Sequence, residues 1–486
     1  MIKDTLSLNP SDIYKALAVK DEQKVSQENI TKQLDPSQHA VFDTTTRPKK
    51  DVKKPNGRKD EKGEPLYDTV QEEVNRIPLG FQQIIVNRAV GFLLGIPVKL
   101  RSYAVDDPEK KLAAMIQKTW DDNKLDFFNR KLARRVFAEC EAAELWYLVD
   151  DSSFWASLWA KLKSAVGAAT SSKFRLRVRL ISPLLGDKLY PHYDEYGDMD
   201  AFSREYIVTE NGKKVSRFDI YTADVVVNMV KGDGGWTEEK RAANPFKKIP
   251  VIYYSQEVPE WYLVQGLIER YETQMSNLAD TNDYFGSPMV KVKGKVLGFA
   301  SKGEQGKVLQ MEKDADASYL SYDNAPESIK LELETLEKHI YGLTQTPNIS
   351  FENMKSMGDV SGIALKLKFM DAHLKVENKL ELFGEMFQRR LNLLKNVLGM
   401  VVDTSLSQQV LTLEMEPIFT PYLPKNVKEE VDILATATGK PIMSVKTAIE
   451  NNPLVGDADE EISRMDEEAK AELTASRNAL SGTLNM

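Results

Sequence analysis

Apolar residues recur at helical spacing over an unusually long stretch in the last third of the chain. The pattern opens near Asp359, with apolar positions at Ile363, Leu367, Met370, Leu374, Leu380, Phe383, Phe387, Leu391, Leu394 and Leu398. A helix of this span is roughly 57 Å long, too long for the middle of an ordinary domain. Because the irregular run Asn348–Gly358 precedes it, the pattern predicts a strut in a large assembly, with a loop at its tip.

Over residues 78–149 the apolar residues recur mostly at helical spacing. Helical spacing is found over residues 81–92, 111–120 and 127–144, and Leu145–Val149 has the composition of a strand. Further on, a β pattern covers residues 174–254: Arg175–Leu180 alternates with a period of two, and Asn211-Gly212 is typical of a hairpin turn. The acidic run Tyr193–Asp200 also predicts a turn between strands, since it lacks the ligand spacing of a calcium loop.

Two helical patterns bracket a small β module. Proline opens each of them, at Pro259 and Pro326, as suits a first helical turn. Alternating segments lie between them, namely Met289–Lys293, Lys307–Met311 and Ser318–Tyr322. After the long helix, Val410–Met415 predicts one more strand. Residues 424–475 are helical and acidic, with breaks at Gly439–Pro441 and Asn451–Pro453, and the tail Ser476–Met486 is predicted to be disordered.

Two segments stand outside this scheme. Residues 1–75 predict a loosely ordered arm, in which Asn9-Pro10 opens a short helix. The basic run at 47–59 suits contact with DNA or an acidic partner, but a solvated flexible loop explains it better.

Residues 151–173 carry an apolar stripe with two tryptophans, Trp155 and Trp159. A helix on a membrane surface is one interpretation, and a short helix packed on the protein or a neighbouring subunit is the favoured one.

Composition narrows the class of protein. The chain has 486 residues, one cysteine (Cys140) and a formal net charge of −8. It therefore has room for several domains, fits a reducing compartment and lacks the basic character of a tight nucleic-acid binder. No secretion signal is visible, and the most apolar window, Ile84–Leu100, is too short and polar to span a bilayer. We expect a soluble protein made in the cytoplasm.

Recognisable catalytic chemistry is missing from the sequence. The four histidines, His39, His192, His339 and His373, are far apart and have no zinc-ligand spacing. Gly303–Val308 is the nearest fragment to a phosphate-binding loop, and it lacks the length and the magnesium-binding hydroxyl. We therefore predict a protein that is not an enzyme and that needs no cofactor or metal.

The order of elements, helix, β module, helix, loop and long helix beside a mixed α/β body, resembles the portal proteins of tailed bacteriophages, in particular those of long, non-contractile-tailed phages. The segments that carry this likeness are Asn87–Val98, Leu189–Asp198, Ile340–Asn348 with Ser361–Lys366, and Val455–Glu468. The resemblance covers roughly residues 78–470 and implies an α+β portal fold.

That family scheme implies a division of the chain. It comprises a mixed wing (78–256), stem helix 1 (257–284), a clip (285–325), stem helix 2 (326–346), a tunnel loop (347–360), the long helix with a wing strand (361–422) and a helical crown (423–475). The N-terminal arm (1–77, partly disordered) and the disordered tail (476–486) lie outside the resemblance and are predicted from the residues alone. The resemblance further implies a ring, usually a dodecamer, at one capsid vertex of the virion. Double-stranded DNA would pass through it. The implied partners are the terminase packaging motor, major capsid and scaffolding proteins and a head–tail adaptor, with no membrane.

Three groups of candidate site residues follow from that scheme. Acidic side chains of stem helix 1 would face the channel and repel phosphates, so that DNA slides; the candidates are Glu269, Glu272, Asp280 and Asp283. A solvated outer helix face is the equally good alternative. The tunnel loop would meet DNA through Ser350, Asn353, Met354, Lys355, Ser356 and Met357, although its methionines also suit packing against a neighbouring subunit. Docking on the clip would use Lys291, Lys293, Lys295 and Lys302.

Two other functions remain open from the sequence. One is a ring-shaped membrane or secretion pore anchored by the segment with Trp155 and Trp159. The other is a metal-dependent nuclease whose acidic residues assemble only in space.

Overall fold

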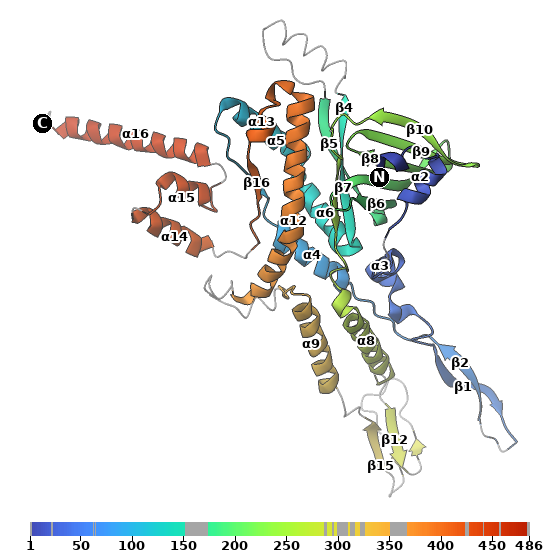
Figure 1. The fold of residues 1–486 in the computed structure, drawn as a ribbon. Helices are drawn as coiled ribbons and strands as arrows, with labels where there is room; N and C mark the ends of the chain where they lie inside the picture. Colours follow the sequence, from blue (N-terminus) through green and yellow to red (C-terminus); the bar gives the residue numbers. More distant parts are fainter. Residues whose placement is uncertain are drawn as a thin grey trace. The chain divides into compact units, whose positions relative to one another are not determined.

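The computed structural model describes residues 2–20, 23–61, 63, 65–150, 174–285, 289–293, 296–298, 310–311, 316–320, 326–349, 367–422, 427–440, 442–455 and 458–483. Helices and antiparallel sheets are both extensive, so the fold class is α+β, as predicted (Figure 1). The chain forms two compact units, residues 1–347 with 374–421, and residues 348–373 with 422–486.

The helices are α1 (Ile2–Thr5), α2 (Pro10–Leu17), α3 (Gln27–Leu34), α4 (Phe81–Leu94), α5 (Asp107–Asp122), α6 (Leu125–Glu139), α8 (Gln265–Phe285), α9 (Pro326–Leu343), α12 (Met370–Val397), α13 (Gln409–Thr412), α14 (Val427–Gly439), α15 (Val445–Asn451) and α16 (Ala458–Thr483). Short 3-10 turns lie at η1 (Pro36–Gln38), η2 (Ala40–Phe42), η3 (Pro183–Leu185), η4 (Tyr262–Val264) and η6 (Thr404–Leu406), and a π-helical turn, η5 (Leu398–Val402), follows α12.

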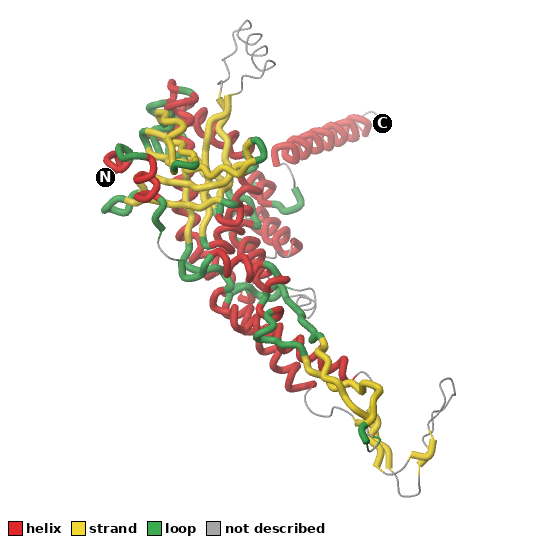
Figure 2. The backbone as a smooth tube through the Cα atoms, turned by 90° about the vertical axis from the view of Figure 1, so that its right-hand side faces the viewer, coloured by secondary structure: helices red, strands yellow, loops and turns green. Residues whose placement is uncertain are grey.

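The strands are β1 (Lys50–Lys59), β2 (Pro65–Glu72), β3 (Lys99–Ser102), β4 (Glu141–Asp150), β5 (Phe174–Ile181), β6 (Asp187–Tyr193), β7 (Met199–Glu210), β8 (Lys213–Thr222), β9 (Val225–Gly232), β10 (Gly235–Ala243), β11 (Val251–Ser255), β12 (Met289–Lys293), β13 (Val296–Gly298), β14 (Gln310–Met311), β15 (Asp316–Leu320) and β16 (Met415–Ile418). Figure 2 shows them gathered in the sheets of the first unit and in the small β module beyond α8 and α9.

Two sheets form the centre of the first unit. A five-stranded antiparallel meander has the order β10-β9-β8-β7-β6, and a three-stranded sheet has the order β11-β4-β5. The predicted turn at Asn211-Gly212 joins β7 to β8, and both residues adopt positive φ, 50° and 79°, as a type I′ hairpin requires. Apolar side chains from both sheets meet in one buried cluster, which includes Phe202, Val251 and Tyr253.

The N-terminal segment is more ordered than the loosely ordered arm that its composition predicts. Asn9 caps α2 by accepting from the N–H of Asp12, and Pro10 occupies the first turn, as expected. Ile13 and Leu17 of α2 are buried in a cluster with residues of the five-stranded sheet, and the ring of Tyr14 stacks on Trp236 at 4.6 Å. The prediction failed because the partner surface lies some 200 residues further along the chain. The basic run is likewise not a loop but part of the β1–β2 hairpin.

Two boundaries of the first unit differ from prediction. The helix expected over 127–144 ends at Glu139, because Cys140 adopts the left-handed conformation (φ 67°), and β4 begins at Glu141. The strand predicted at Val410–Met415 is wrong for most of its length. Residues 409–412 form the single turn α13, and β16 begins only at Met415, where it pairs with β3. Short apolar runs do not distinguish a strand from a helical turn.

The long helix α12 has 28 residues, which gives a length of about 42 Å. It begins at Met370, and the expected start near Asp359 lies outside the described residues. Phe383, Phe387, Leu391 and Leu394, all predicted to be apolar positions of one helix, are fully buried. The predicted helix is therefore confirmed over residues 370–397, and the second half of it lies in the core of the first unit.

The C-terminal residues of the second unit form α14, α15 and α16. The first two end at Gly439 and Asn451, the breaks that the sequence predicts. Ser444 caps α15 by accepting from the N–H of Thr447 at 3.1 Å. Helix α16 continues to Thr483, so the prediction of a disordered tail from residue 476 is wrong for most of that tail.

Candidate functional site

Helices α8 and α9 form the antiparallel pair that the sequence predicts around the β module. Helix α9 begins at Pro326 as expected, whereas α8 begins at Gln265, after the turn η4, six residues later than predicted. Across the pair, the guanidinium of Arg270 lies 2.8 Å from Glu332 Oε1, and Gln274 donates to Glu332 Oε2 at 2.9 Å. Beyond the pair, β12 pairs with β15 and β13 with β14. Strands β12, β14 and β15 fall on the three segments predicted from alternation, whereas β13 was not predicted.

Glu272 of α8 is buried, with a side-chain exposure of 1%. Its Oε1 atom lies 2.6 Å from His39 Nδ1 and accepts from the backbone N–H of Leu79 at 2.7 Å. Burial alone would lower the pKa of His39, but the hydrogen bond to Glu272 and its negative charge raise that pKa above the ordinary value. The expectation that Glu272 faces a channel is therefore wrong, because the chain's own N-terminal segment covers it.

Asp280 and Asp283 contact the same N-terminal segment. Asp280 forms ion pairs with Arg47 and, at 3.3 Å, with Lys50, and it accepts from the backbone N–H of Asn75 at 2.8 Å. Burial alone would raise the pKa of Asp280, but the N–H of Asn75 and the charge of Lys50 lower it. Asp283 accepts from the Asn75 amide at 2.6 Å and is otherwise exposed. We call residues 39–50 and 73–79 together the strap.

The strap changes the picture of the acidic helix. Of the four carboxylates predicted to repel DNA, Glu272, Asp280 and Asp283 bind the strap. Glu269, which is half-buried, accepts from Gln265 of its own helix at 2.9 Å. Arg47, Lys50 and His39 pair with most of the negative charge on this face of α8. Sequence alone shows the carboxylates but not their partners, which lie more than 200 residues away.

An ion cluster connects α12 with one end of the helix pair, where α8 begins and α9 ends. Glu260, just before η4, lies 2.5 Å from both Lys375 Nζ and Lys379 Nζ of α12, and its side chain is 5% exposed. Lys375 also donates to the carbonyl of Thr344, at the end of α9, at 2.8 Å. Burial alone would raise the pKa of Glu260, but the two ammonium groups lower it. The cluster thus fixes Thr344, three residues before the predicted tunnel loop.

A second buried network fastens α12 to the three-stranded sheet. The fully buried guanidinium of Arg390 donates to both carboxylate oxygens of Glu144 in β4, at 3.0 and 2.9 Å, and to Asn129 of α6 at 2.8 Å. Tyr254 of β11 donates to the same carboxylate at 2.5 Å, and the ring of Phe387 lies 4.0 Å below the guanidinium. With every charged atom paired, the network holds α12 in one position.

The comparison with known families decides what kind of protein carries this arrangement. Residues 47–474 match the model of a family described as phage portal protein, SPP1 Gp6-like. The chain belongs to the phage portal protein family. The resemblance inferred from the sequence is therefore confirmed, and the chain is a structural component of a bacteriophage virion.

Other comparisons add little to this family assignment. No curated protein sequence matches the chain. Among solved structures, it is similar to a chain in the virion of a native gene transfer agent particle, with 10% identity over 75% of this chain and 86% of that one. The TM-score of that likeness is 0.35, too low to carry an argument.

The remaining site residues expected of this portal chain fall mostly outside the described residues. Ser350, Asn353, Met354, Lys355, Ser356 and Met357 all do, as do Lys295, Lys302 and the segment 151–173. Lys291 and Lys293 lie in β12 and are exposed, so they are accessible on the β module.

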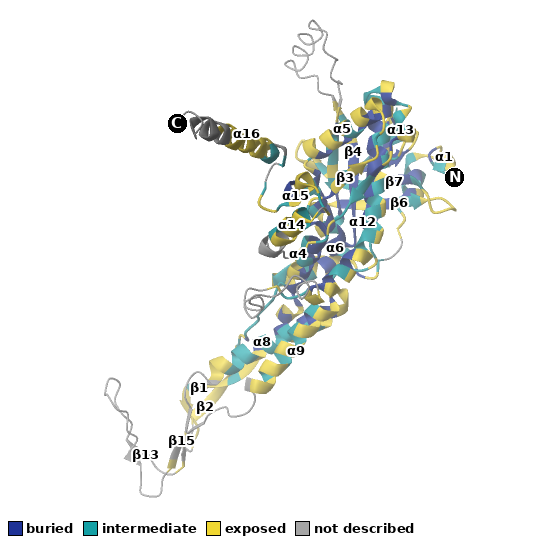
Figure 3. Cartoon of the chain, turned by 90° about the vertical axis from the view of Figure 1, so that its left-hand side faces the viewer, coloured by how far each residue is buried: buried dark blue, intermediate teal, exposed yellow. Residues whose placement is uncertain are grey.

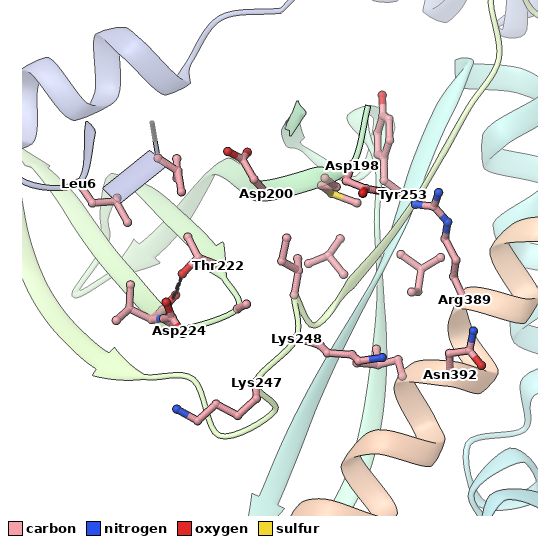
Figure 4. A pocket seen from close by; sticks show the side chains of 18 of the residues that line it. Leu6, Asp198, Asp200, Thr222, Asp224, Lys247, Lys248, Tyr253, Arg389 and Asn392 are labelled. Atoms are coloured by element: carbon pink, nitrogen blue, oxygen red, sulfur yellow. Dashed lines mark hydrogen bonds between the residues drawn. The ribbon is translucent and has the colours of Figure 1, made fainter. Parts of the chain in front are cut away.

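A cleft of about 900 Å³ lies in the first unit between α1, β11 and α12. Figure 4 shows Arg389 and Asn392 of α12 on one side and Leu6 and Asp224 on the other. Its lining is mainly apolar, and Lys3 pairs with Asp224 at 3.1 Å.

Among the described residues, no group of histidine, cysteine and carboxylate side chains is arranged to hold a metal. Nor does any helix of the described portal chain have the length and apolar character to cross a membrane.

Four side chains that make the contacts of the strap and the ion cluster were not predicted from the sequence. His39 and Arg47 stand in a segment whose composition is typical of unstructured chain, and Lys375 and Lys379 have the spacing of ordinary solvated positions of a helix. One signal was available for the lysines: their spacing of four places both on one face of the helix, next to buried Val376.

Proposed function

We propose that copies of this chain form a closed ring, usually a dodecamer, at one vertex of the capsid. Viral DNA enters and leaves through the central channel, and the ring is the platform for the packaging motor and later the head–tail adaptors. Membership of the phage portal protein family over residues 47–474 is the observation that carries this proposal. Capsid and scaffolding proteins are the further partners that such a position requires.

The parts of the chain receive roles within that ring. Residues 78–256 and the strand β16 serve as the wing, α8 and α9 as the stem, 285–325 as the clip, 347–360 as the tunnel loop and 423–475 as the crown. The exposed lysines Lys291 and Lys293 suit a clip that docks partners. The ion cluster of Glu260, Lys375 and Lys379 supports the loop assignment, since it gives the segment after Thr344 a rigid base.

Little of the acidic stem face is then free to repel DNA. The strap binds Glu272 and Asp280. Of the four candidate carboxylates, Asp283 and half-buried Glu269 therefore retain some exposure to solvent. In this proposal DNA slides past a surface of low net charge, and weak contacts come from the loop candidates around Lys355. Weak contacts suit a conduit because each strong phosphate contact releases counterions and would hold the duplex.

Electron microscopy of the purified full-length protein tests the ring. A closed ring with a channel at least as wide as a DNA duplex is the expected result. A stable monomer or an open filament under native conditions would show that the proposed function is wrong.

A deletion tests the role of the loop. Removing residues 350–357, or changing Lys355→Ala, should leave the ring intact and reduce DNA packaging or retention in an in vitro packaging reaction. Lys338→Ala, at an exposed position of α9, is the matched control and should package normally. Loss of the ring in the deletion would show that the segment serves assembly instead.

A further inference from the structure

The β1–β2 hairpin is a two-stranded ribbon with an unusual degree of exposure. Val52 pairs with Val70 and Pro55 with Tyr67. Almost every residue is exposed, including Leu66 (42%), Tyr67 (55%) and Val70 (41%) (Figure 3). An isolated two-stranded hairpin is at best marginally stable in water, and its edges present unpaired backbone groups. The ribbon therefore gains stability from any surface that covers it.

The base of the ribbon is fixed to α8. Arg47 Nε donates to the carbonyl of Asn75 at 2.8 Å, and Arg76 donates to the carbonyl of Arg47 at 2.9 Å. These bonds join the two chain segments that lead into β1 and out of β2. Both segments bind Asp280, through Arg47, Lys50 and Asn75. The ribbon consequently starts from a defined point beside the C-terminal end of α8 (Figures 1 and 3).

The ribbon begins on the side of α8 that faces away from α9 of the same chain. The strap contacts Glu272, Ser276 and Asp280, which lie on one face at intervals of four residues. Contacts with α9 come from Arg270 and Gln274. A separation of two residues corresponds to a rotation of about 200° around a helix. The two faces are thus nearly opposite, so the ribbon is directed away from its own α9.

Charges on the ribbon and on α9 are complementary. Lys53, Arg58 and Lys59 of β1 are exposed and form no ion pair with any described residue. On α9, Glu327 and Glu334 are exposed, and among the described residues Glu334 forms a loose ion pair with Lys330 at 3.7 Å. Gln274 lies opposite Glu332, so the antiparallel geometry puts Asp280 level with the start of α9. The base of the ribbon and Glu327 therefore lie at about the same height along the helix pair, and Glu334 lies two turns, roughly 10 Å, further along α9.

We propose that the ribbon of one copy docks on the N-terminal half of α9 of a neighbouring copy, with Lys53, Arg58 and Lys59 facing Glu327 and Glu334. The inference rests on the proposed ring, in which every copy is at the same height and presents its acidic α9 to a neighbour. Each copy then gives one ribbon and receives one, which is the head-to-tail contact that closes a ring. Tyr67, on the same face as Lys53 and Pro55, supplies apolar contact area.

Photo-crosslinking tests the contact directly. Benzoylphenylalanine is placed at position 67 in the full-length protein, and assembled rings are irradiated. A covalent dimer whose crosslinked peptide lies within residues 326–338 is the expected product. Crosslinks confined to the same chain, crosslinks to another part of the neighbour, or no crosslink in intact rings would overturn the inference.

Charge reversal tests the same contact independently. The triple variant Lys53→Glu, Arg58→Glu, Lys59→Glu should need an at least roughly tenfold higher protein concentration to assemble, equivalent to about 1.4 kcal/mol. Adding Glu327→Lys and Glu334→Lys should restore assembly. The matched control is Lys213→Glu with Lys214→Glu at the exposed β7–β8 turn, which should assemble normally.

The two failures are distinguishable. If the unmodified protein forms no ring, the proposed function is wrong. If it forms rings whose assembly ignores the triple variant, only the docking of the ribbon is wrong.

Discussion

At the scale of single residues, the ion cluster of Glu260, Lys375 and Lys379 makes a sharp energetic prediction. Glu260→Gln leaves Lys375, which is 8% exposed, without its carboxylate. Removing one member of a buried pair costs about 3–5 kcal/mol. We therefore expect a loss of about 3 kcal/mol in the free energy of unfolding, measured with urea.

Two further variants check the cause of that loss. Glu260→Gln combined with Lys375→Met should lose less than the sum of the single changes, because the two residues are coupled. Glu377→Gln removes an exposed carboxylate of the same helix, α12, and should change the stability by less than about 0.5 kcal/mol. Equal losses for Glu260→Gln and Glu377→Gln would contradict the account.

The His39–Glu272 pair predicts a pH dependence with a defined sign. The pKa of His39 is raised in the folded protein, so the protonated form stabilises the strap. That contribution is fully present below the unfolded pKa, about 6.5, and is lost as the pH rises through the folded pKa. The melting temperature of the unmodified protein should therefore exceed that of His39→Gln most at low pH, and the difference should shrink towards alkaline pH.

His192 supplies a control of opposite sign. Burial lowers its pKa, so protonation favours the unfolded chain. Compared with His192→Gln, the unmodified protein should lose stability as the pH falls. If the difference in melting temperature changed with pH in the same direction for both histidine variants, a general titration of the protein would explain the change. The His39–Glu272 pair would then not be its cause.

At the scale of elements, the strap is expected to open without unfolding α8. Arg47→Met removes the ion pair with Asp280 and the bond to Asn75. Limited proteolysis should then cut residues 39–79 several-fold faster, while the helix content in circular dichroism is retained. Arg217→Met, which breaks contacts to Glu210 and Glu239 on the five-stranded sheet, is the matched change and should leave that rate unaltered.

How much of these elements the sequence could predict depends on the range of the interactions. Pro10, Pro326, the Asn211-Gly212 turn and the helix breaks at 439 and 451 act locally, so those elements were predicted correctly. The packing of α2 and the burial of Glu272 depend on partners far along the chain. Composition alone therefore predicts a loosely ordered arm around α2 and a solvated carboxylate at Glu272. The candidate site was predictable as a set of carboxylates and lysines but not as a set of contacts.

At the scale of the whole molecule, the charge balance predicts weak, salt-tolerant behaviour towards DNA. Each copy has a formal net charge of −8, and Arg47 and Lys50 of the strap are already paired with Asp280 of α8. Fluorescence anisotropy with a short duplex should therefore detect only weak binding that changes little with salt, because few counterions are released. Tight binding with a steep salt dependence would contradict the picture of a conduit.

The position of β16 near the end of the first unit affects when that unit can fold during synthesis. Residues 415–418 pair with residues 99–102, and Arg390 reaches Glu144 across 246 positions of sequence. A contact between such distant residues forms slowly and only after both have been synthesised. The first unit therefore completes its core only when most of the chain has left the ribosome. Chains that end before Met415 lack the closing strand and the last buried contacts, so we expect them to be excluded from assembly by misfolding rather than incorporated as defective subunits.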